Sequence, residues 1–326
     1  MDHQNRKPST AQTARPDAGD VLGTYLRAQA TAFLRAMRLH AENAGSGAAA
    51  DAAEGGEAAR SLRGAARRIG GSLATFRVVT ESSWADALRT ELVWLSSTLA
   101  HEHAYAARLS RLMDALHRLS GSPELPAPRG SAGALTVGSA RAGALLERQL
   151  TLSRTRAHSA TLQALGSSRF HAVADAVAVL ASEVPLDAVA ARGRVSEVLA
   201  PLAAVAETRL SAAVAALPPV DGAHPYNAAH DGLWHEVRRL LRVHRYAREA
   251  MGEDVTRPAA AGEALDRHRD AAEAANASAT AARTPRIAPA TAYALGVLHA
   301  DQRHEVEAAR LEFRHLWLPE PAVTPR

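Results

Sequence analysis

Apolar residues recur every three or four positions along almost the whole chain, and no segment alternates β-branched with polar residues as a half-exposed strand does. A repeat of this length places apolar side chains on one face of a helix, so the sequence predicts an all-α fold. Helix boundaries are expected where glycine or proline interrupts the repeat. The predicted helices span residues 19–44, 57–79, 83–119, 140–166, 168–182, 187–216, 230–251, 260–282 and 288–317.

The chain of 326 residues is longer than one average domain and divides into two helical halves. Each half contains one helix with a concentrated row of arginines. We therefore expect two antiparallel bundles whose arginine rows face a shared basic groove. The predicted parts are a disordered N-terminal tail at 1–19, a first half at 20–165, a second half at 166–318 and a C-terminal tail at 319–326.

The composition excludes several classes of protein. The absence of cysteine excludes disulfides, thiolate metal sites and cysteine nucleophiles, and it agrees with a reducing compartment. We find neither the apolar core of a secretory signal nor an apolar run that would cross a bilayer, so a soluble cytoplasmic protein is expected. The net charge of +4 is modest, and Lys7 is the only lysine. An anionic partner therefore has to be argued from where the arginines cluster.

The clearest cluster lies in WHEVRRLLRVHRYARE, residues 234–249, whose charges hardly alternate in sign. On a helix the apolar residues of this segment face one way, and a sector of about 80° on the other side is mostly basic. Such a face suits an anionic ligand, whereas a solvated face normally mixes both signs. The sector holds His235, Arg238, Arg242, Arg245 and Glu249.

A second row lies in EAARSLRGAARRIGGSLATF, residues 57–76, with Arg60, Arg63 and Arg67 on one side and Arg68 at its edge. Like charges at these spacings repel by roughly a few tenths of a kcal/mol per pair. A single row is better explained by solvated arginines whose stems cover apolar surface. Two rows in corresponding halves favour a ligand, because guanidinium groups match phosphate oxygens and recur about every 5 Å along a helix.

With these residues the chain resembles the CHAD domain family, whose name stands for conserved histidine α-helical domain. The second half is similar to the family's His-x-x-Arg-x3-Lys/Arg-Arg-x-Arg-Tyr-x-x-Glu helix, with Val243 at one basic position. Segments 265–274 and 293–317 resemble later parts of the family, and the likeness extends over residues 20–318. The matched positions of the helix are His235, Arg238, Arg242, Arg245, Tyr246 and Glu249.

The first half resembles the family less closely. Arg63, Arg67 and Arg68 match the family's first arginine helix. Other family positions have changed, so we expect weaker binding by this half. The departures are Arg60 at the name-giving histidine, Gly70 at the last arginine, and His103 and Ala104 in place of a charged pair.

The resemblance implies two pseudo-symmetric helical bundles that bind inorganic polyphosphate, with its counter-cations, in a basic groove. It implies no catalysis and no cofactor, and a cytoplasmic location at polyphosphate granules follows only from it. The oligomeric state stays open. Arg141 and Arg148, seven residues apart on one helix, are expected to add a basic rim. The predicted polyphosphate-binding residues are Arg60, Arg63, Arg67, Arg68, Arg141, Arg148, His235, Arg238, Arg239, Arg242, Arg245 and Tyr246.

Two other interpretations of the arginine rows remain. One is a generic polyanion-binding module for nucleic acid or an acidic protein, and the other is a purely structural helical scaffold. Base stacking would need aromatic residues among the basic ones, and only Trp234 and Tyr246 are near, which does not favour nucleic acid. A narrow groove would favour a thin polymer, and a broad flat patch would favour a duplex. No membrane partner is expected.

Catalytic and metal-binding motifs are missing from the sequence. It has no Walker loop, dinucleotide loop or Gly-x-Ser-x-Gly elbow. The CYTH domain that accompanies some CHAD domains needs a Glu-x-Glu-x-Lys signature, which a chain with Lys7 as its only lysine lacks. His101 and His103 point apart on a helix, and His299 and His304 are five residues apart, so neither pair suits a metal ion. We therefore expect a binding module without a metal site.

Overall fold

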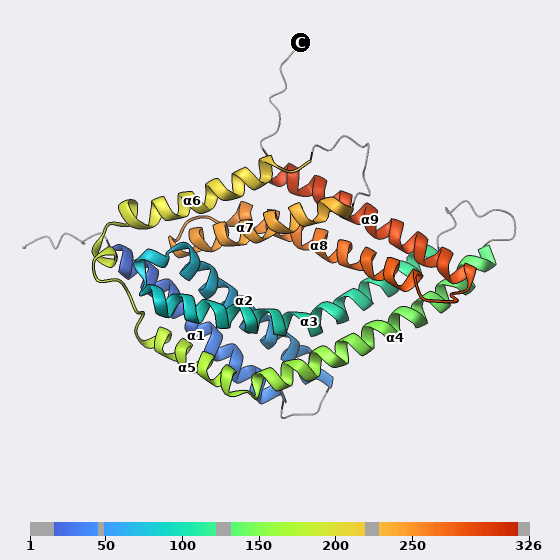
Figure 1. Cartoon of the computed structure of the whole chain (residues 1–326), viewed down its shortest axis with the longest axis horizontal. Coiled ribbons are helices and arrows are strands. Elements are labelled where there is room, and N and C mark those ends of the chain that lie inside the picture. Colours follow the sequence, from blue (N-terminus) through green and yellow to red (C-terminus); the bar gives the residue numbers. More distant parts are fainter. Residues whose placement is uncertain (1–15, 45–48, 122–131, 219–227, 319–326) are drawn as a thin grey trace, which may run out of the picture.

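The computed structural model of the protein describes residues 16–44, 49–121, 132–218 and 228–318 (Figure 1). These residues form helices and, apart from two isolated bridges, no β-structure, which confirms the predicted all-α fold. The main helices are α1 (Ala18–Ala44), α2 (Ala49–Thr75), α3 (Ser82–Gly121), α4 (Ala132–Leu165), α5 (Ser168–Ser182), α6 (Val195–Ala215), α7 (Asp231–Ala250), α8 (Thr256–Ala282) and α9 (Pro289–Trp317).

Every predicted helix has an observed counterpart. The predicted first residue is furthest from the observed one in α2, α4 and α6. Helices α2 and α4 begin earlier than predicted, whereas α6 begins at Val195 and not at residue 187. The backbone before α6 pairs with the start of α1 instead, because the Ala18 amide donates to the Gly193 carbonyl at 2.8 Å. Arg194 is extended and forms a bridge with Asp17. Backbone groups that pair with α1 in this way are not free to form the hydrogen bonds of a helix.

The helices form a flat, elongated molecule in which α3 runs from one end toward the other (Figure 1). One core joins α1, α2, α3, α5 and the start of α6. A second core joins the end of α3 with α4, α8 and α9, and a third joins α6, α7, α8 and α9. The first core contains Phe33 and Val177, which lie on either side of the predicted boundary at residue 165. The first core therefore continues across residue 165. The division into two halves stays a prediction from the sequence. The predicted tails lie almost wholly outside the described residues.

Helix α6 is long and apolar enough, by length and composition, to cross a membrane, contrary to the expectation from the sequence. Its Leu199 and Leu210 are fully buried in the protein's own cores, and the helix packs against α7. Only 17% of the apolar stretch is buried, and a single helix that meets a test of length and composition carries no further conclusion.

Candidate anion-binding site

Helices α2 and α7 approach each other closely at a glycine. A Cβ atom on Gly71 would lie 2.8 Å from Cδ2 of Tyr246, closer than real contacts allow. The ring of Tyr246 is buried and packs on the α2 backbone at this point. The missing side chain therefore lets the arginine rows of the two helices lie near each other.

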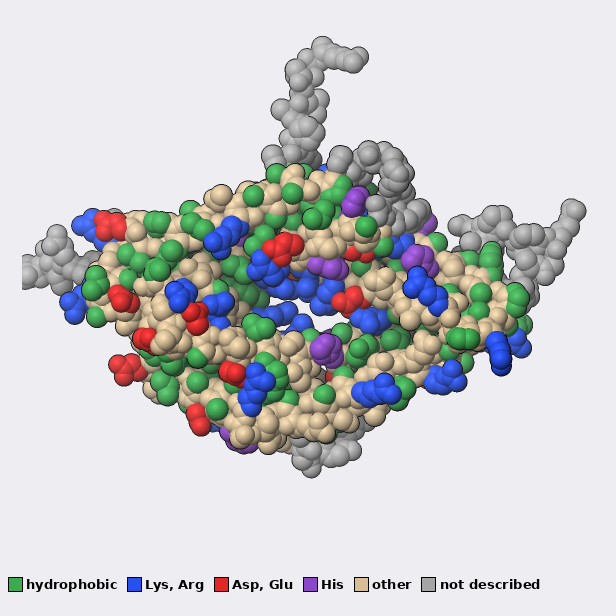
Figure 2. Space-filling view, in the orientation of Figure 1, with side chains coloured by type: hydrophobic (Ala, Val, Ile, Leu, Met, Phe, Trp, Pro, Cys, Tyr) green, Lys and Arg blue, Asp and Glu red, His purple; other side chains and the backbone are tan. Residues whose placement is uncertain are grey.

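Five arginines of α2, α7 and α8 form what we call the central arginine cluster. Burial and the nearby charges of the other members lower the pKa of Arg63 to about 10. The same causes lower the pKa of Arg242 to about 9, so both side chains stay protonated at neutral pH. Figure 2 shows Lys and Arg side chains gathered around a hollow in the middle of the molecule. The members of the cluster are Arg63, Arg67, Arg238, Arg242 and Arg269.

Carboxylates neutralise only part of this charge. Arg238 pairs with Asp266, and Arg269 pairs with Asp270. Burial still lowers the pKa of Arg238, and the charge of Arg269 lowers it further while Asp266 opposes the change. The two carboxylates face five guanidinium groups, so the cluster keeps an excess of positive charge.

Three members of the cluster have no carboxylate partner among the described residues, and two of them also have buried donors without an acceptor. These two are Arg67 and Arg242, and Nε of Arg67 and Nη1 of Arg242 are buried without a hydrogen-bond partner there. Arg63 is satisfied differently, because its Nε donates to the backbone carbonyl of Ser96 at 3.1 Å. Buried donors without acceptors are uncommon in folded proteins and indicate where an anionic ligand would fit.

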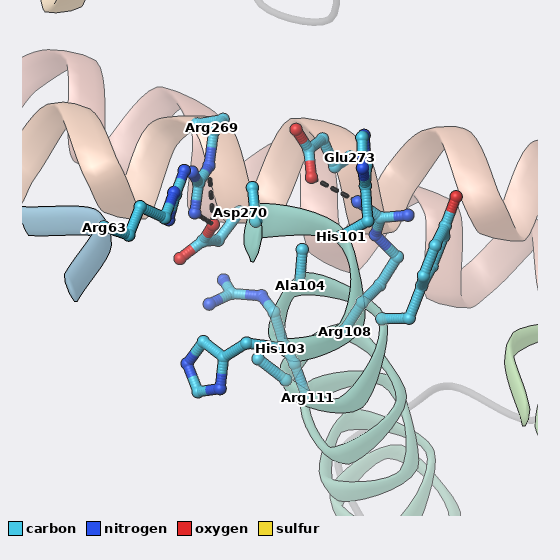
Figure 3. A pocket seen from close by; sticks show the side chains of 12 residues that line it. Arg63, His101, His103, Ala104, Arg108, Arg111, Arg269, Asp270 and Glu273 are labelled. Atoms are coloured by element: carbon cyan, nitrogen blue, oxygen red, sulfur yellow. Dashed lines mark hydrogen bonds and ion pairs between the residues drawn. The ribbon is translucent and has the colours of Figure 1, made fainter. Parts of the chain in front are cut away.

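A cavity of about 470 Å³ opens beside the cluster (Figure 3). Figure 3 shows the guanidinium ends of Arg63 and Arg269 side by side on one wall of this cavity. Arg108 and Arg111 of α3 line it too, and Arg108 pairs with Glu273. The cavity therefore extends the basic surface from the cluster toward α3.

His103 lines the same cavity at a position where the family has a charged residue. Burial lowers the pKa of this imidazole, and the positive charges of Arg60 and Arg63 lower it further, whereas Asp270 raises it. The ring is therefore neutral at neutral pH. It adds no fixed positive charge to the site.

Residues 28–286 match the sequence pattern of the CHAD domain. The chain belongs to the CHAD domain family. This CHAD domain is similar to PptA from Streptomyces chartreusis at 57% identity and a TM-score of 0.79, over 93% of this chain and 100% of that one. It also shares its fold with the CHAD domain of the plant Ricinus communis, at 21% identity and a TM-score of 0.58, over 97% and 99% of the two chains. A comparison with curated proteins gave no match.

Arg68 and Arg245, two predicted site residues of this CHAD domain, lie beside a carboxylate. Glu249 accepts hydrogen bonds from Nε of Arg68 at 2.9 Å and from the Tyr25 hydroxyl at 3.1 Å. Its other oxygen lies 3.2 Å from Nε of Arg245. Burial, followed by the charge of Glu249, raises the pKa of Tyr25. Glu249 therefore joins α1, α2 and α7 and neutralises part of the charge of both arginines.

The other predicted residues on α2 and α7 have different surroundings. Arg60 and Arg239 are exposed and lie beside carboxylates of their own helices, Glu57 and Glu236. His235 packs edge-on against His268, and burial lowers its pKa. These three residues remain predicted ligand contacts. Arg60 and Arg239 are more exposed to solvent than His235.

Arg141 and Arg148 do not join the central arginine cluster. Both are exposed on α4, which packs against α3, α8 and α9 and not against α2 or α7. The structure therefore places them on a separate surface and does not support their prediction as a rim of the same groove.

Arg269 of α8 and Arg108 of α3 were missed as site residues from the sequence. Arg269 lies in segment 265–274, which resembles a later part of the family, but that resemblance does not mark Arg269 as a ligand contact. Arg269 stands between His268 and Asp270, and Arg108 has only Arg111 near it at helical spacing, so neither belongs to a concentrated basic row. Only the packing of α3 and α8 against α2 and α7 brings them to the site.

A buried ion network fixes the start of α7 on α9. Asp231, in the first turn of α7, accepts hydrogen bonds from Arg303 at 2.7 and 3.2 Å and from Arg310 at 2.6 Å. His268 lies 3.7 Å from the same carboxylate, and burial, with Arg310 next, lowers its pKa to about 3. The network is thus a structural support next to the site. Among the described residues, no group of three or more His, Asp or Glu side chains is arranged to hold a metal ion.

Proposed function

We propose that this CHAD domain binds inorganic polyphosphate through the central arginine cluster and catalyses no reaction. The observation that carries the proposal is that Nε of Arg67 and Nη1 of Arg242, on two half-buried side chains without a carboxylate partner, are buried without an acceptor among the described residues. A buried donor without an acceptor is costly. Phosphate oxygens would supply both the missing negative charge and the missing hydrogen-bond acceptors.

The arrangement of the cluster supports a thin polymer over a duplex. The arginines come from three helices around a hollow and do not form one broad flat surface (Figure 2). Single-stranded nucleic acid would need exposed aromatic rings for its bases, and Trp234 and Tyr246 are 2% and 3% exposed. A chain of phosphates needs neither a wide groove nor a ring.

Cellular location is part of the same proposal. A protein that binds polyphosphate would collect where the polymer is concentrated, together with the polymer's Mg²⁺ or Ca²⁺ counter-ions. We expect a fluorescently tagged protein to coincide with cytoplasmic polyphosphate granules. A tagged protein that stays evenly distributed in cells rich in granules would contradict this part of the proposal.

The direct test compares two arginines of the same helix. Arg242→Gln removes a half-buried, unpaired charge, and we expect polyphosphate affinity to fall by about tenfold to a hundredfold, since a charge-assisted contact contributes about 1.5–3 kcal/mol. Arg248→Gln is the matched control, because Arg248 pairs with Glu253 and lies outside the central arginine cluster. Isothermal titration calorimetry with polyphosphate of defined length measures both.

Thermal unfolding separates a binding role from a structural one. Burial and neighbouring charges already disfavour the Arg242 cation in the free protein. Its replacement by glutamine should therefore leave the melting temperature unchanged or raise it. Equal affinities of the two variants, or unfolding of the Arg242 variant, would contradict the proposal.

A further inference from the structure

Helix α4 carries its own row of arginines on the side opposite its core contacts. Its Leu146 and Leu150 are buried between α3 and α9, whereas Arg141, Arg148 and Arg156 are exposed. We call these three arginines the α4 basic face. They span sixteen residues of helix, a rise of about 22 Å at 1.5 Å per residue.

No carboxylate neutralises the α4 basic face within the described part of the chain. The structure gives Arg141, Arg148 and Arg156 no ion pair or hydrogen bond there, although all three side chains are exposed. Glu147 is the only acidic residue of α4, and it points about a third of a turn away from Arg148. Figure 2 shows Lys and Arg side chains spaced along the edge that α4 occupies in Figure 1, with no acidic side chain between them.

The α4 basic face is separate from the central arginine cluster. Helix α3 lies between them, because it packs against α4 and also supplies Arg108 and Arg111 to the cavity beside the cluster (Figure 1). A helix is about 10 Å wide, and charges in physiological salt are screened over about 8 Å. An anion on one surface therefore leaves the other free to bind a second one.

We propose that the α4 basic face is a second polyphosphate-binding surface, so that one molecule holds two polymer segments at once. The inference rests on the proposed function of the central arginine cluster. A flexible polyanion fits here, because three unpaired guanidinium groups along a straight helix match a linear row of phosphates. Exposed contacts are weaker than buried ones. Two sites on one molecule nevertheless cross-link long chains, because binding at the first site raises the local concentration of polymer at the second.

A two-chain capture assay tests this inference. The purified full chain is bound to immobilised long-chain polyphosphate, free protein is washed away, and fluorescently end-labelled short polyphosphate is added. The wild type should retain the labelled chain on its second site. The combined variant Arg141→Gln, Arg148→Gln and Arg156→Gln should be captured equally well but retain about tenfold less label, because three phosphate contacts are lost.

A charge-matched control separates location from net charge. The combined variant Arg77→Gln, Arg169→Gln and Arg194→Gln removes the same number of positive charges from exposed arginines that pair with carboxylates. It should retain label as the wild type does. Equal label on the α4 variant and the wild type, or an equal loss in this control, would overturn the second site.

The two proposals fail differently. If immobilised polyphosphate does not capture the wild type, the proposed function itself is wrong. If capture succeeds but no labelled chain is retained, only the second site is wrong. Equal retention of labelled duplex DNA and labelled polyphosphate would make the α4 basic face a generic polyanion surface and overturn its assignment to polyphosphate.

Discussion

Gly71 is the residue that sets how closely the two arginine helices approach. Gly71→Ala places a Cβ 2.8 Å from the buried ring of Tyr246, so α2 or α7 must shift. We expect this overpacking to cost about 1–3 kcal/mol of stability and to weaken polyphosphate binding. Urea unfolding and calorimetric titration of the variant measure the two effects.

Gly70 provides the matched control at the neighbouring position. A Cβ there would meet only the Leu92 Cβ, at an ordinary 3.9 Å. Gly70→Ala should therefore stabilise the protein by up to about 1 kcal/mol, as alanine favours a helix over glycine. If Gly71→Ala stabilises the protein as Gly70→Ala does, the close approach does not position the site.

The sequence predicted some site residues and missed others for identifiable reasons. Arg67, Arg238 and Arg242 were predicted because each belongs to a row at helical spacing. Arg269 was missed because a single arginine between a histidine and an aspartate looks like an ordinary solvated position. Glu249 matched the family motif, but its role in holding Arg68 depends on two helices that are far apart in sequence.

At the scale of elements, the buried carboxylate of Asp231 holds the start of α7 on α9. Asp231→Asn would leave Arg303, 1% exposed, without its carboxylate partner, and Arg310, 5% exposed, with Glu307 alone. Breaking a buried ion pair in this way costs about 3–5 kcal/mol, so a large drop in unfolding free energy is expected. Chemical denaturation measures it.

The control for this prediction is an exposed carboxylate that also pairs with two arginines. Asp86 also accepts hydrogen bonds from two arginines, Arg77 and Arg89, but in solvent. Asp86→Asn should change the unfolding free energy little, since exposed ion pairs are screened by water and salt. Similar losses of unfolding free energy in the Asp86 and Asp231 variants would contradict the claim that burial makes the Asp231 network more important for stability.

The sequence predicted where the helices lie along the chain, but it did not predict which helices contact one another. The apolar repeat of α7 fixes which face is buried, and Trp234, Val237 and Leu241 are indeed buried. The start of α6 was wrong because its preceding backbone pairs with α1, a partner that no local pattern reveals. The separation of Arg141 and Arg148 from α2 could not be predicted for the same reason, since it depends on where α4 packs.

At the scale of the whole molecule, the family and the all-α fold were predicted, but the division of the core was not. Residues of α1 and α5 share one core although they lie on both sides of the predicted boundary. A repeat in the sequence reports similar helices. It does not report which helices share a core, because packing joins elements across the repeat.

The central claim is that a thin polyphosphate chain, and not polyanions in general, fits the central arginine cluster. The measurement that tests it most directly is the ratio of affinities for polyphosphate and for duplex DNA of equal total charge in one buffer. Salt should weaken both complexes through counter-ion release, so only their ratio reports the fit.

We predict that polyphosphate binds much more tightly than duplex DNA, and that its affinity rises with chain length until the basic track is filled. Varying the chain length in the same titration therefore measures how long the track is. Equal affinities, tighter binding of the duplex, or no dependence on polyphosphate length would contradict the account while leaving the helical fold unchanged.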